Sequence, residues 1–194
     1  MDPLESRQRI LEAAEARFRR YGFAKSTMSE IATDCSMSAG NLYRYFDSKE
    51  EIGAQVAMRC IRGHEEIGRI MLGRRDLNAT GKLERFVTEV ALDTHERVVK
   101  DRELNDLVLY ITEKRNDVVE PYTQNLIDLI SLILAEGDAS GEFEIEDLAT
   151  TARTVLFACK SVVHPLLLAK SSLQGTEANA RMIVRLLVKG LRPS

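Results

Sequence analysis

The sequence predicts an all-α protein of about nine helices, and three observations lead to this prediction. Apolar residues recur at spacings of three and four almost from end to end of the 194 residues, as they do on one face of an amphipathic helix. Only four prolines interrupt a chain rich in Leu, Ala, Glu and Arg, which are good helix formers. No segment of any length shows the alternation of apolar and polar residues that marks a half-buried strand.

The first helix is expected over about 6–21. Ile10, Ala14 and Phe18 recur at four-residue spacing and so share one face, and Gly22 supplies the stop that often follows a helix. This face predicts the side of the helix that packs against the rest of a small N-terminal core.

Two helix-start signals of the same kind follow. TMSE, which begins at Thr27, and SKEE, which begins at Ser48, are both capping boxes, in which a hydroxyl accepts from the third helical amide and a glutamate reaches back to the cap. Ser38 is a third cap. These signals predict short helices over about 28–35 and 39–46.

The second and third helices are joined by only three residues, SMS. Two short helices connected in this way match the helix-turn-helix motif. Four residues of the motif are expected to face inward: Ile31, Ala32, Met37 and Leu42.

A longer fourth helix begins at Lys49 and is expected to continue as one segment through Ile52, Val56, Ile67 and Ile70. It is the segment that links the N-terminal helices to the remainder of the chain.

Five more helices follow the polar segment LGRRDLNATGK. The middle one, over about 122–134, is apolar on more than one face, which indicates burial on several sides. The glycine-containing segment EGDASGEFEIED is expected to be a loop. In the next helix, over about 155–169, Pro165 has no N–H to donate to the carbonyl four residues earlier, which predicts a kink.

The composition, 44% apolar and 29% charged, is that of a soluble globular protein. A net charge of −3 provides no overall basic charge, so any contact with nucleic acid depends on local geometry. The three cysteines lie far apart and form no disulfide framework, which favours the reducing cytoplasm. No apolar run is long enough to span a membrane, and the N-terminus does not resemble a signal peptide, so no membrane partner is expected.

No pattern indicates an enzyme, a metal site or a cofactor, and none of these is expected. GHEEIG places His64 beside two carboxylates but lacks the second histidine of a His-Glu-x-x-His site, so a solvated helix face is expected there. The chain also lacks a phosphate-binding glycine loop and a nucleophile elbow.

The segment SAGNLYRYFDSKEE contains the candidate DNA-binding residues. A recognition helix enters the major groove with its N-terminal end first, which favours small or polar residues there, and Ser38, Ala39, Gly40 and Asn41 have this character. Asn41 is suited to an adenine edge, and Arg44 to guanine or to phosphate.

The remaining residues of this segment have two interpretations. Tyr43 and Tyr45 suit phosphate contacts, and Lys49 adds charge to the free amides of a helix start. Alternatively, the aromatic residues fill the small core. Leu42 and Phe46, four residues apart, share a face and are assigned to the core. Acids outnumber bases by three to two over residues 27–49, which keeps a role without DNA open.

Residues 10–52, ILEAAEARFRRYGFAKSTMSEIATDCSMSAGNLYRYFDSKEEI, resemble the DNA-binding domain of the TetR family of bacterial transcription regulators. The family pattern is a first helix ending in Gly and an aromatic residue, then Thr, then Ile-Ala, then Ser-x-Gly-x-Leu-Tyr-x-x-Phe-x-Ser-Lys-Glu. The sequence meets it almost throughout. The length and the helical character of the rest of the chain also fit.

The resemblance implies a helix-turn-helix domain over 1–47 and a helical effector-binding and dimerisation domain over 48–194. It implies phosphate contacts from Thr27, Tyr43, Tyr45 and Lys49, and contacts to base edges or their surroundings from Ala39, Gly40, Asn41 and Arg44. The turn departs from the usual small-Gly or small-Asn followed by Val, because it reads Cys35-Ser36-Met37. Ser36 is therefore expected to adopt the left-handed conformation with modest strain.

The C-terminal region has two expected roles under this resemblance. Dimerisation is assigned to an apolar face of the last two helices, which otherwise belongs to the monomer core: Leu156, Val163, Leu167, Ile183, Leu186 and Leu187. A pocket for an apolar or amphipathic small molecule is assigned to the middle helices. Its candidate contacts, for each of which core packing is the alternative, are Phe86, His95, Tyr110, Tyr122 and Phe157.

The sequence thus predicts a homodimeric, ligand-responsive repressor of palindromic operator DNA, released when an effector shifts the fourth helix. The alternative is a helical ligand-binding or interaction module without DNA-binding activity. Salt-dependent binding to DNA distinguishes the two.

Overall fold

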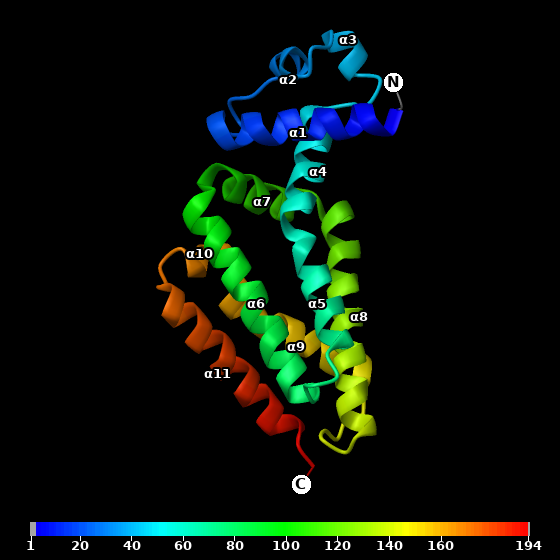
Figure 1. The fold of residues 1–194 in the computed structure, drawn as a ribbon, viewed down its shortest axis with the longest axis vertical. Coiled ribbons are helices and arrows are strands. Elements are labelled where there is room, and N and C mark those ends of the chain that lie inside the picture. Colours follow the sequence, from blue (N-terminus) through cyan, green and yellow to red (C-terminus); the bar gives the residue numbers. More distant parts are fainter. Residues whose placement is uncertain (1–2, 194) are drawn as a thin grey trace. The chain divides into compact units, whose positions relative to one another are not determined.

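The computed structural model describes residues 3–193, and it contains helices but no strand within that range. The all-α prediction is therefore confirmed. Segments α4 and α5 together occupy the expected fourth helix, and α9 and α10 the expected helix over about 155–169, so the eleven segments of the described residues correspond to the nine helices expected. The segments, labelled in Figure 1, are α1 (Pro3–Tyr21), α2 (Met28–Asp34), α3 (Ala39–Leu42), α4 (Lys49–Ile61), α5 (Gly63–Gly73), α6 (Ala79–Lys100), α7 (Arg102–Lys114), α8 (Asn116–Ala139), α9 (Leu148–Val163), α10 (Pro165–Leu168) and α11 (Leu173–Leu191).

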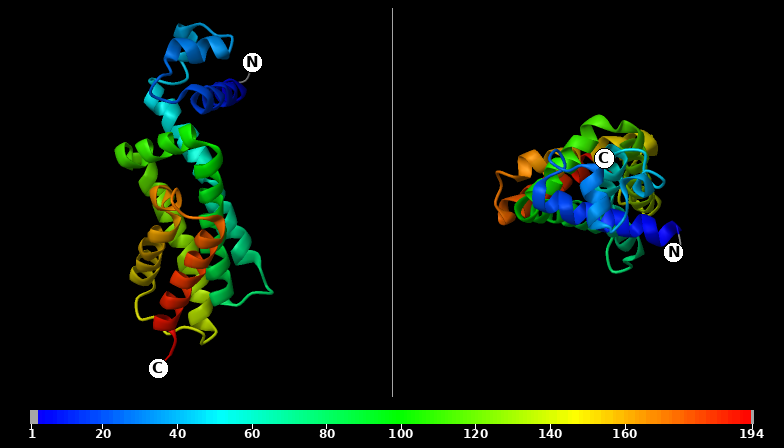
Figure 2. Two further views of the ribbon diagram at one scale, coloured as in Figure 1. Left: turned by 90° about the vertical axis from the view of Figure 1, so that its left-hand side faces the viewer. Right: turned by 90° about the horizontal axis from the view of Figure 1, so that it is seen from above.

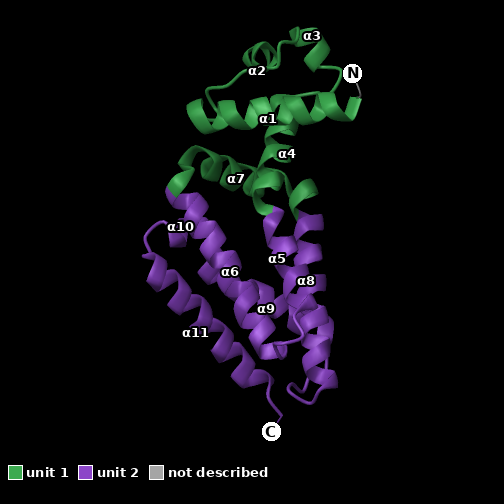
Figure 3. Cartoon of the chain, viewed as in Figure 1, with its two compact units in different colours: residues 1–61, 100–119 green, residues 62–99, 120–194 purple. Residues whose placement is uncertain are grey.

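The chain forms two compact units (Figure 3). Unit 1 contains the chain up to Ile61 together with Lys100–Val119, and unit 2 contains Arg62–Val99 and the chain from Glu120 onward. By contacts, α4 and α7 therefore belong with the first three helices. The functional boundary expected after residue 47 stays a prediction.

The core of unit 1 forms where α1 packs against α2, α4 and α7. The predicted inner face of α1 is buried, with Ile10, Ala14 and Phe18 inaccessible to solvent. In Figure 1, α2 and α3 lie on the same side of α1. From α7, four apolar side chains are also buried: Leu104, Leu107, Val108 and Ile111.

The predicted caps and turn of unit 1 are present. Thr27 forms both halves of its capping box with Glu30, and the Ser48 hydroxyl accepts from the Glu51 N–H at 3.1 Å. The Glu51 carboxylate accepts from the Asp47 N–H, at 2.9 Å, one residue before the expected cap. Ser36 has φ of 56°, the left-handed conformation predicted for the turn, which strains a residue that carries a Cβ.

Unit 2 has an apolar core that α5, α6, α8, α9 and α11 share. In Figures 1 and 2, α11 lies alongside α6 and α9, and α9 packs directly against α11. Among the helices of residues 3–193, none is both long and apolar enough to cross a membrane.

The prediction of one continuous fourth helix is wrong, because the segment is interrupted at Arg62. Arg62 keeps right-handed helical angles, φ −62° and ψ −22°, so the interruption lies in the hydrogen bonding. The Glu65 N–H donates to the Arg62 carbonyl, three residues back instead of four.

The loop expected from Glu136 begins later, because α8 continues through Ala139. Gly137 explains why a glycine lies inside this helix: a Cβ there would come within 2.1 Å of the Phe143 ring. The chain turns after α8, and the Phe143 ring packs against the backbone of Gly137, where no side chain is in the way. The kink predicted at Pro165 is a full interruption, since α9 ends at Val163 and Pro165 begins α10.

Two groups of part-buried polar contacts connect segments of unit 2. The Glu142 carboxylate accepts from the N–H groups of Ala79 and Thr80, both at 3.0 Å, and so caps the start of α6. The Lys82 ammonium, on α6, donates to the Leu72 carbonyl at the end of α5, at 3.1 Å, and to the Glu136 carboxylate on α8.

Candidate functional site

The predicted reading segment is a very short helix followed by tighter turns. The Ser38 hydroxyl accepts from the Asn41 N–H at 3.2 Å and caps α3, as predicted. The expected helix to residue 46 is too long, because α3 ends at Leu42. Beyond it, Arg44 and Tyr45 donate to carbonyls three residues back, which is 3₁₀-type bonding.

The aromatic residues of this segment divide by face as expected. Leu42 and Phe46 are 0% and 1% exposed, whereas Tyr43 is 52% exposed and Arg44 is also on the surface. Tyr45 is half-buried. A Cβ added to Gly40 would meet no atom within 4 Å, so the surface at the start of α3 is open to close approach.

Two arginines of α1, Arg7 and Arg9, contact the helix-turn-helix. Arg7 donates to the Tyr45 carbonyl, lies 4.2 Å above the Phe46 ring centroid and is 3.6 Å from the Glu51 carboxylate. Arg9 donates to the Cys35 carbonyl in the turn, at 3.1 Å. Because guanidinium groups are planar and rich in donors, these contacts fix the orientation of a helix too short to be stable alone.

A third arginine of α1 connects to α2. Arg17 donates to both carboxylate oxygens of Asp34, at 2.5 and 3.1 Å, and lies 3.3 Å from Glu30. The hydrogen bond from Arg17 lowers the pKa of the Asp34 carboxyl below its ordinary value.

The lowered Asp34 pKa predicts how the stability of unit 1 depends on pH. A carboxyl with a lowered folded-state pKa contributes stability that is full above its unfolded pKa, about 4, and is lost as the pH falls through the folded value. Asp34→Asn is therefore expected to be destabilised at pH 7 by about 0.5–1 kcal/mol, since solvent screens a carboxylate that is 35% exposed, and the difference from the parent protein should shrink below about pH 4.

Urea denaturation of both proteins at a series of pH values measures this. Asp106→Asn, at an exposed carboxylate on α7 of the same unit, is the control, and it should change stability little. A destabilisation by Asp34→Asn that stays constant from pH 7 down to pH 2 would contradict the role of the Arg17 pair.

Lys49, expected to contact phosphate, is positioned at the start of α4. Its ammonium donates to the Phe23 carbonyl at 3.0 Å and lies 4.5 Å from the centroid of the Phe23 ring. Thr27, at the start of α2, is exposed. Unit 1 therefore contains both groups suited to phosphate and residues suited to base edges.

In unit 2, His64 is only 5% exposed, which corrects the expectation of a solvated helix face. Its Nε2–H donates to the Asp93 carboxylate at 3.1 Å, since a carboxylate can only accept. In the neutral imidazole, Nδ1 then accepts from the Tyr122 hydroxyl at 2.7 Å. The bond from His64 lowers the pKa of Asp93, and burial raises the pKa of Tyr122.

Sequence reasoning missed His64 because its partners lie 29 and 58 residues away. Apolar periodicity cannot show a polar group that is buried among polar partners. One sequence feature does indicate that this face of the helix is buried. Gly68 lies one turn after His64, and a glycine on a helix face allows a neighbouring side chain to pack close to the backbone. A Cβ at Gly68 would lie 3.3 Å from the Phe86 ring.

The five expected effector contacts do not form one cluster. Phe86 is buried in the core of unit 2, and Tyr122 packs at its edge. His95 is hydrogen-bonded to the Thr176 hydroxyl at 3.1 Å. Phe157 is exposed under the Lys160 ammonium, and Tyr110 belongs to unit 1, where its ring centroid is 5.4 Å from that of Phe23.

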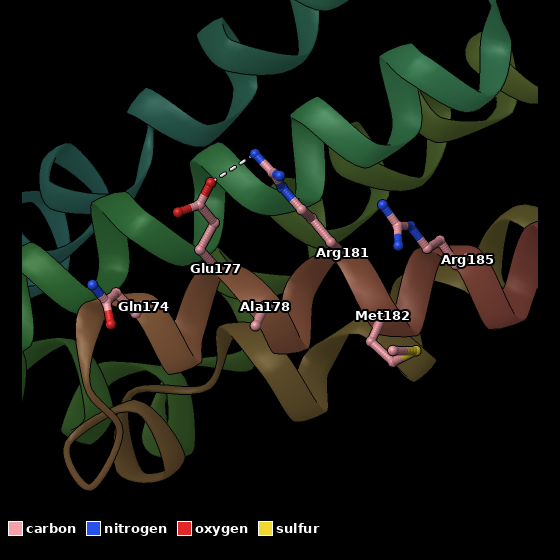
Figure 4. A pocket seen from close by; sticks show the side chains of 6 residues that line it. All are labelled: Gln174, Glu177, Ala178, Arg181, Met182 and Arg185. Carbon is pink, nitrogen blue, oxygen red and sulfur yellow. Dashed lines mark hydrogen bonds and ion pairs between the residues drawn. The ribbon is translucent and has the colours of Figure 1, made fainter.

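The expected dimer residues differ in exposure. Leu167 and Leu186 are exposed, Leu156 is buried in the core of unit 2, and the other three are half-buried: Val163, Ile183 and Leu187. Beside Leu186, α11 has a shallow depression of about 370 Å³, shown in Figure 4. Six residues of α11 line it, four of them polar or charged, with a 2.7 Å ion pair between Glu177 and Arg181: Gln174, Glu177, Ala178, Arg181, Met182 and Arg185.

A helix-turn-helix with a small, open reading helix, combined with a separate helical unit, defines a DNA-binding transcription regulator. Residues 10–56 match the model of the bacterial regulatory proteins of the tetR family, and residues 79–184 match the C-terminal domain described as tetracyclin repressor-like. The chain belongs to the TetR family of bacterial transcription regulators, which are not enzymes.

Relatives match over most of the chain. The uncharacterized HTH-type transcriptional regulator YfiR of Bacillus subtilis (strain 168) is 25% identical, covering 93% of this chain and 90% of its own. The HTH-type transcriptional regulator TtgR of Pseudomonas putida is 25% identical, covering 79% of this chain and 76% of its own. The structure of Thermus thermophilus FadR in complex with lauroyl-CoA has a TM-score of 0.72 at 22% identity, covering 97% of both chains.

Proposed function

We propose that this regulator is a repressor that binds a palindromic operator as a homodimer and is released by an amphipathic small molecule. The observation that supports this most directly is the open N-terminal end of α3, with Asn41, Tyr43 and Arg44 beside it and Leu42 and Phe46 buried beneath. A helix placed in this way enters the major groove with its first residues.

In this proposal Asn41 and Arg44 contact base edges, and Ser38, Ala39 and Gly40 allow the backbone to approach them. Thr27, Tyr43, Tyr45 and Lys49 contact phosphates and set the register. The acids Glu30 and Asp34 do not oppose this assignment, because Arg17 lies within ion-pair distance of both.

The exposed leucines of the last helices support a homodimer. Leu166, Leu167 and Leu186 are all more than half exposed on α10 and α11, and packing of these helices against a second copy of the chain would cover them. A two-fold interface here places two α3 helices on one DNA face, provided that the half-sites lie about 34–36 Å apart.

Selection of bound sequences from a pool of random duplexes tests the DNA-binding proposal. A palindrome with half-sites about one helical turn apart is expected. Asn41→Ala and Arg44→Ala should each relax specificity at one position of each half-site, at about 1–3 kcal/mol for a bidentate contact, whereas Lys49→Ala should weaken binding to all sequences alike.

Arg69→Ala is the matched control, because Arg69 forms exposed ion pairs on α5 of unit 2. It should leave operator binding unchanged. Selection that enriches no sequence, with binding insensitive to salt, would favour the ligand-binding module without DNA-binding activity.

The effector proposal rests on the contrast between the apolar core of unit 2 and the polar cluster of His64, Asp93 and Tyr122 at its edge. An amphipathic ligand suits such an interior, with its apolar part near Phe86 and its polar end near His64 and Tyr122. The lauroyl-CoA in the FadR structure supports this chemical class. His95 remains a further candidate, next to Thr176.

A panel of fatty acids and acyl-CoA thioesters tests this class. A binding member is expected to raise the thermal midpoint and to weaken operator affinity about 5- to 150-fold, the usual range of allosteric coupling. Tyr122→Phe should reduce the affinity for the ligand, and Phe157→Leu, on the exposed face of α9, should not. Operator affinity unchanged by a ligand that demonstrably binds would refute effector-dependent release.

A further inference from the structure

Phe23, in the connection between α1 and α2, is contacted by three helices of unit 1. Its ring centroid lies 5.3 Å from that of Phe18 on α1, in an edge-on arrangement, and 5.4 Å from that of Tyr110 on α7. A Cβ on Gly53 would come within 2.6 Å of the ring, so the ring lies directly on the backbone of α4. Phe23 therefore has little freedom to move while these contacts persist.

Lys49 makes two non-covalent contacts with Phe23. Its ammonium donates to the Phe23 carbonyl at 3.0 Å and lies 4.5 Å from the ring centroid, within the range of a cation–π contact. A free lysine side chain has many rotamers, and fixing one of them is unfavourable in entropy. Phe23 provides this restraint before DNA arrives. Two of the three ammonium protons remain for a phosphate.

We propose that Tyr110 is a positioning residue for DNA binding: from α7 it fixes the Phe23 ring, and Phe23 holds the Lys49 ammonium where it meets a phosphate. This inference rests on the proposed function, since it assumes the Lys49–phosphate contact. Tyr110 itself does not touch DNA in this account. Its contribution is to reduce the conformational freedom of a side chain 61 residues earlier in the sequence, through one intermediate ring.

The salt dependence of operator binding separates this role from simple stabilisation. Fluorescence anisotropy on the selected operator, from about 0.05 to 0.2 M salt, gives the slope of log K against log salt, and the magnitude of this slope falls by about 0.9 when one phosphate is no longer neutralised by the protein. Full-length Lys49→Met removes one phosphate contact from each protomer of the dimer, so it should lower the slope by about 1.8. Tyr110→Ala should lower it in the same direction, and Tyr110→Phe, which keeps the ring, should behave as the parent protein.

The double variant is the decisive measurement. Because Tyr110 acts only through Lys49, Tyr110→Ala should change neither the slope nor the affinity further in the Lys49→Met background. Lys114→Met is the matched control, because it removes an exposed α7 lysine paired with Glu113, and its slope should equal that of the parent protein. If Tyr110→Ala does not fold, Tyr110→Leu keeps the apolar contact without the ring and takes its place.

Additive effects of Tyr110→Ala and Lys49→Met would overturn the inference, because they would show independent contributions. An unchanged slope in Lys49→Met would also overturn it, while base-specific effects of Asn41→Ala and Arg44→Ala would leave the proposed function standing. Absence of operator binding by the parent protein would instead refute the proposed function itself.

Discussion

Leu42→Ala is expected to destabilise unit 1 by about 2–5 kcal/mol and to abolish specific operator binding. Leu42 is fully buried, and it is the last residue of the four-residue helix α3. A helix of one turn has no stability of its own, so its position depends on this side chain and on Phe46. Removing three carbons from beneath it leaves a cavity and frees the reading segment.

Urea denaturation followed by circular dichroism measures the change in the free energy of unfolding, and anisotropy measures the decrease in operator affinity. Tyr43→Ala is the control for stability, because Tyr43 is exposed one residue later, and its effect should stay within about 0.5 kcal/mol. A Leu42→Ala protein as stable as its parent would show that α3 does not depend on this contact.

Glu136→Ala is expected to destabilise unit 2 by about 2–3 kcal/mol. The Lys82 side chain is only 8% exposed, so without Glu136 its ammonium keeps one carbonyl partner in a buried environment. Breaking a fully buried ion pair costs about 3–5 kcal/mol, and the lower value here reflects the 47% exposure of Glu136.

A double replacement provides the control. Lys82→Met removes the buried charge itself, so Lys82→Met combined with Glu136→Ala should recover most of the stability that Glu136→Ala alone removes. A double variant less stable than Glu136→Ala would show that the lysine stem, and not its charge, governs the effect. The measurement is urea denaturation at neutral pH.

Local signals in the sequence predicted the local structure of the helix-turn-helix. The Thr27 and Ser38 caps and the buried pair Leu42 and Phe46 depend on residues within five positions of one another, whereas the left-handed Ser36 is implied by the family resemblance. Caps, turns and helical faces are properties of short segments, which is why a single sequence suffices to predict them.

The errors concern the ends of helices and contacts between distant segments. The break at Arg62 leaves its backbone angles helical, so no residue type marks it. α8 extends through Gly137 because Phe143 folds back onto it, a contact that helix propensity does not report. His64 was misjudged for a related reason, since a polar residue with buried polar partners has the same pattern as one that faces water.

The tyrosine of α7 shows a further limit. Its spacing identifies one face of a helix but not the helix that this face meets. The sequence assigns Tyr110 to an effector pocket, and in unit 1 it meets Phe23. Only the three-dimensional contacts distinguish the two, because both assignments place an aromatic ring against apolar neighbours.

Unit 1 is built from two separate stretches of chain, and this affects how its DNA specificity can be exchanged between regulators. A chimera joined at a single point after Ile61 would carry α1 to α4 away from their own α7. The buried side chains of Leu104, Leu107 and Ile111 would then face a foreign α1 and α4. Recombination that transfers a working helix-turn-helix therefore needs matched crossovers on both sides of α7, and substitutions in α7 should accompany changes in α1 and α4 during evolution.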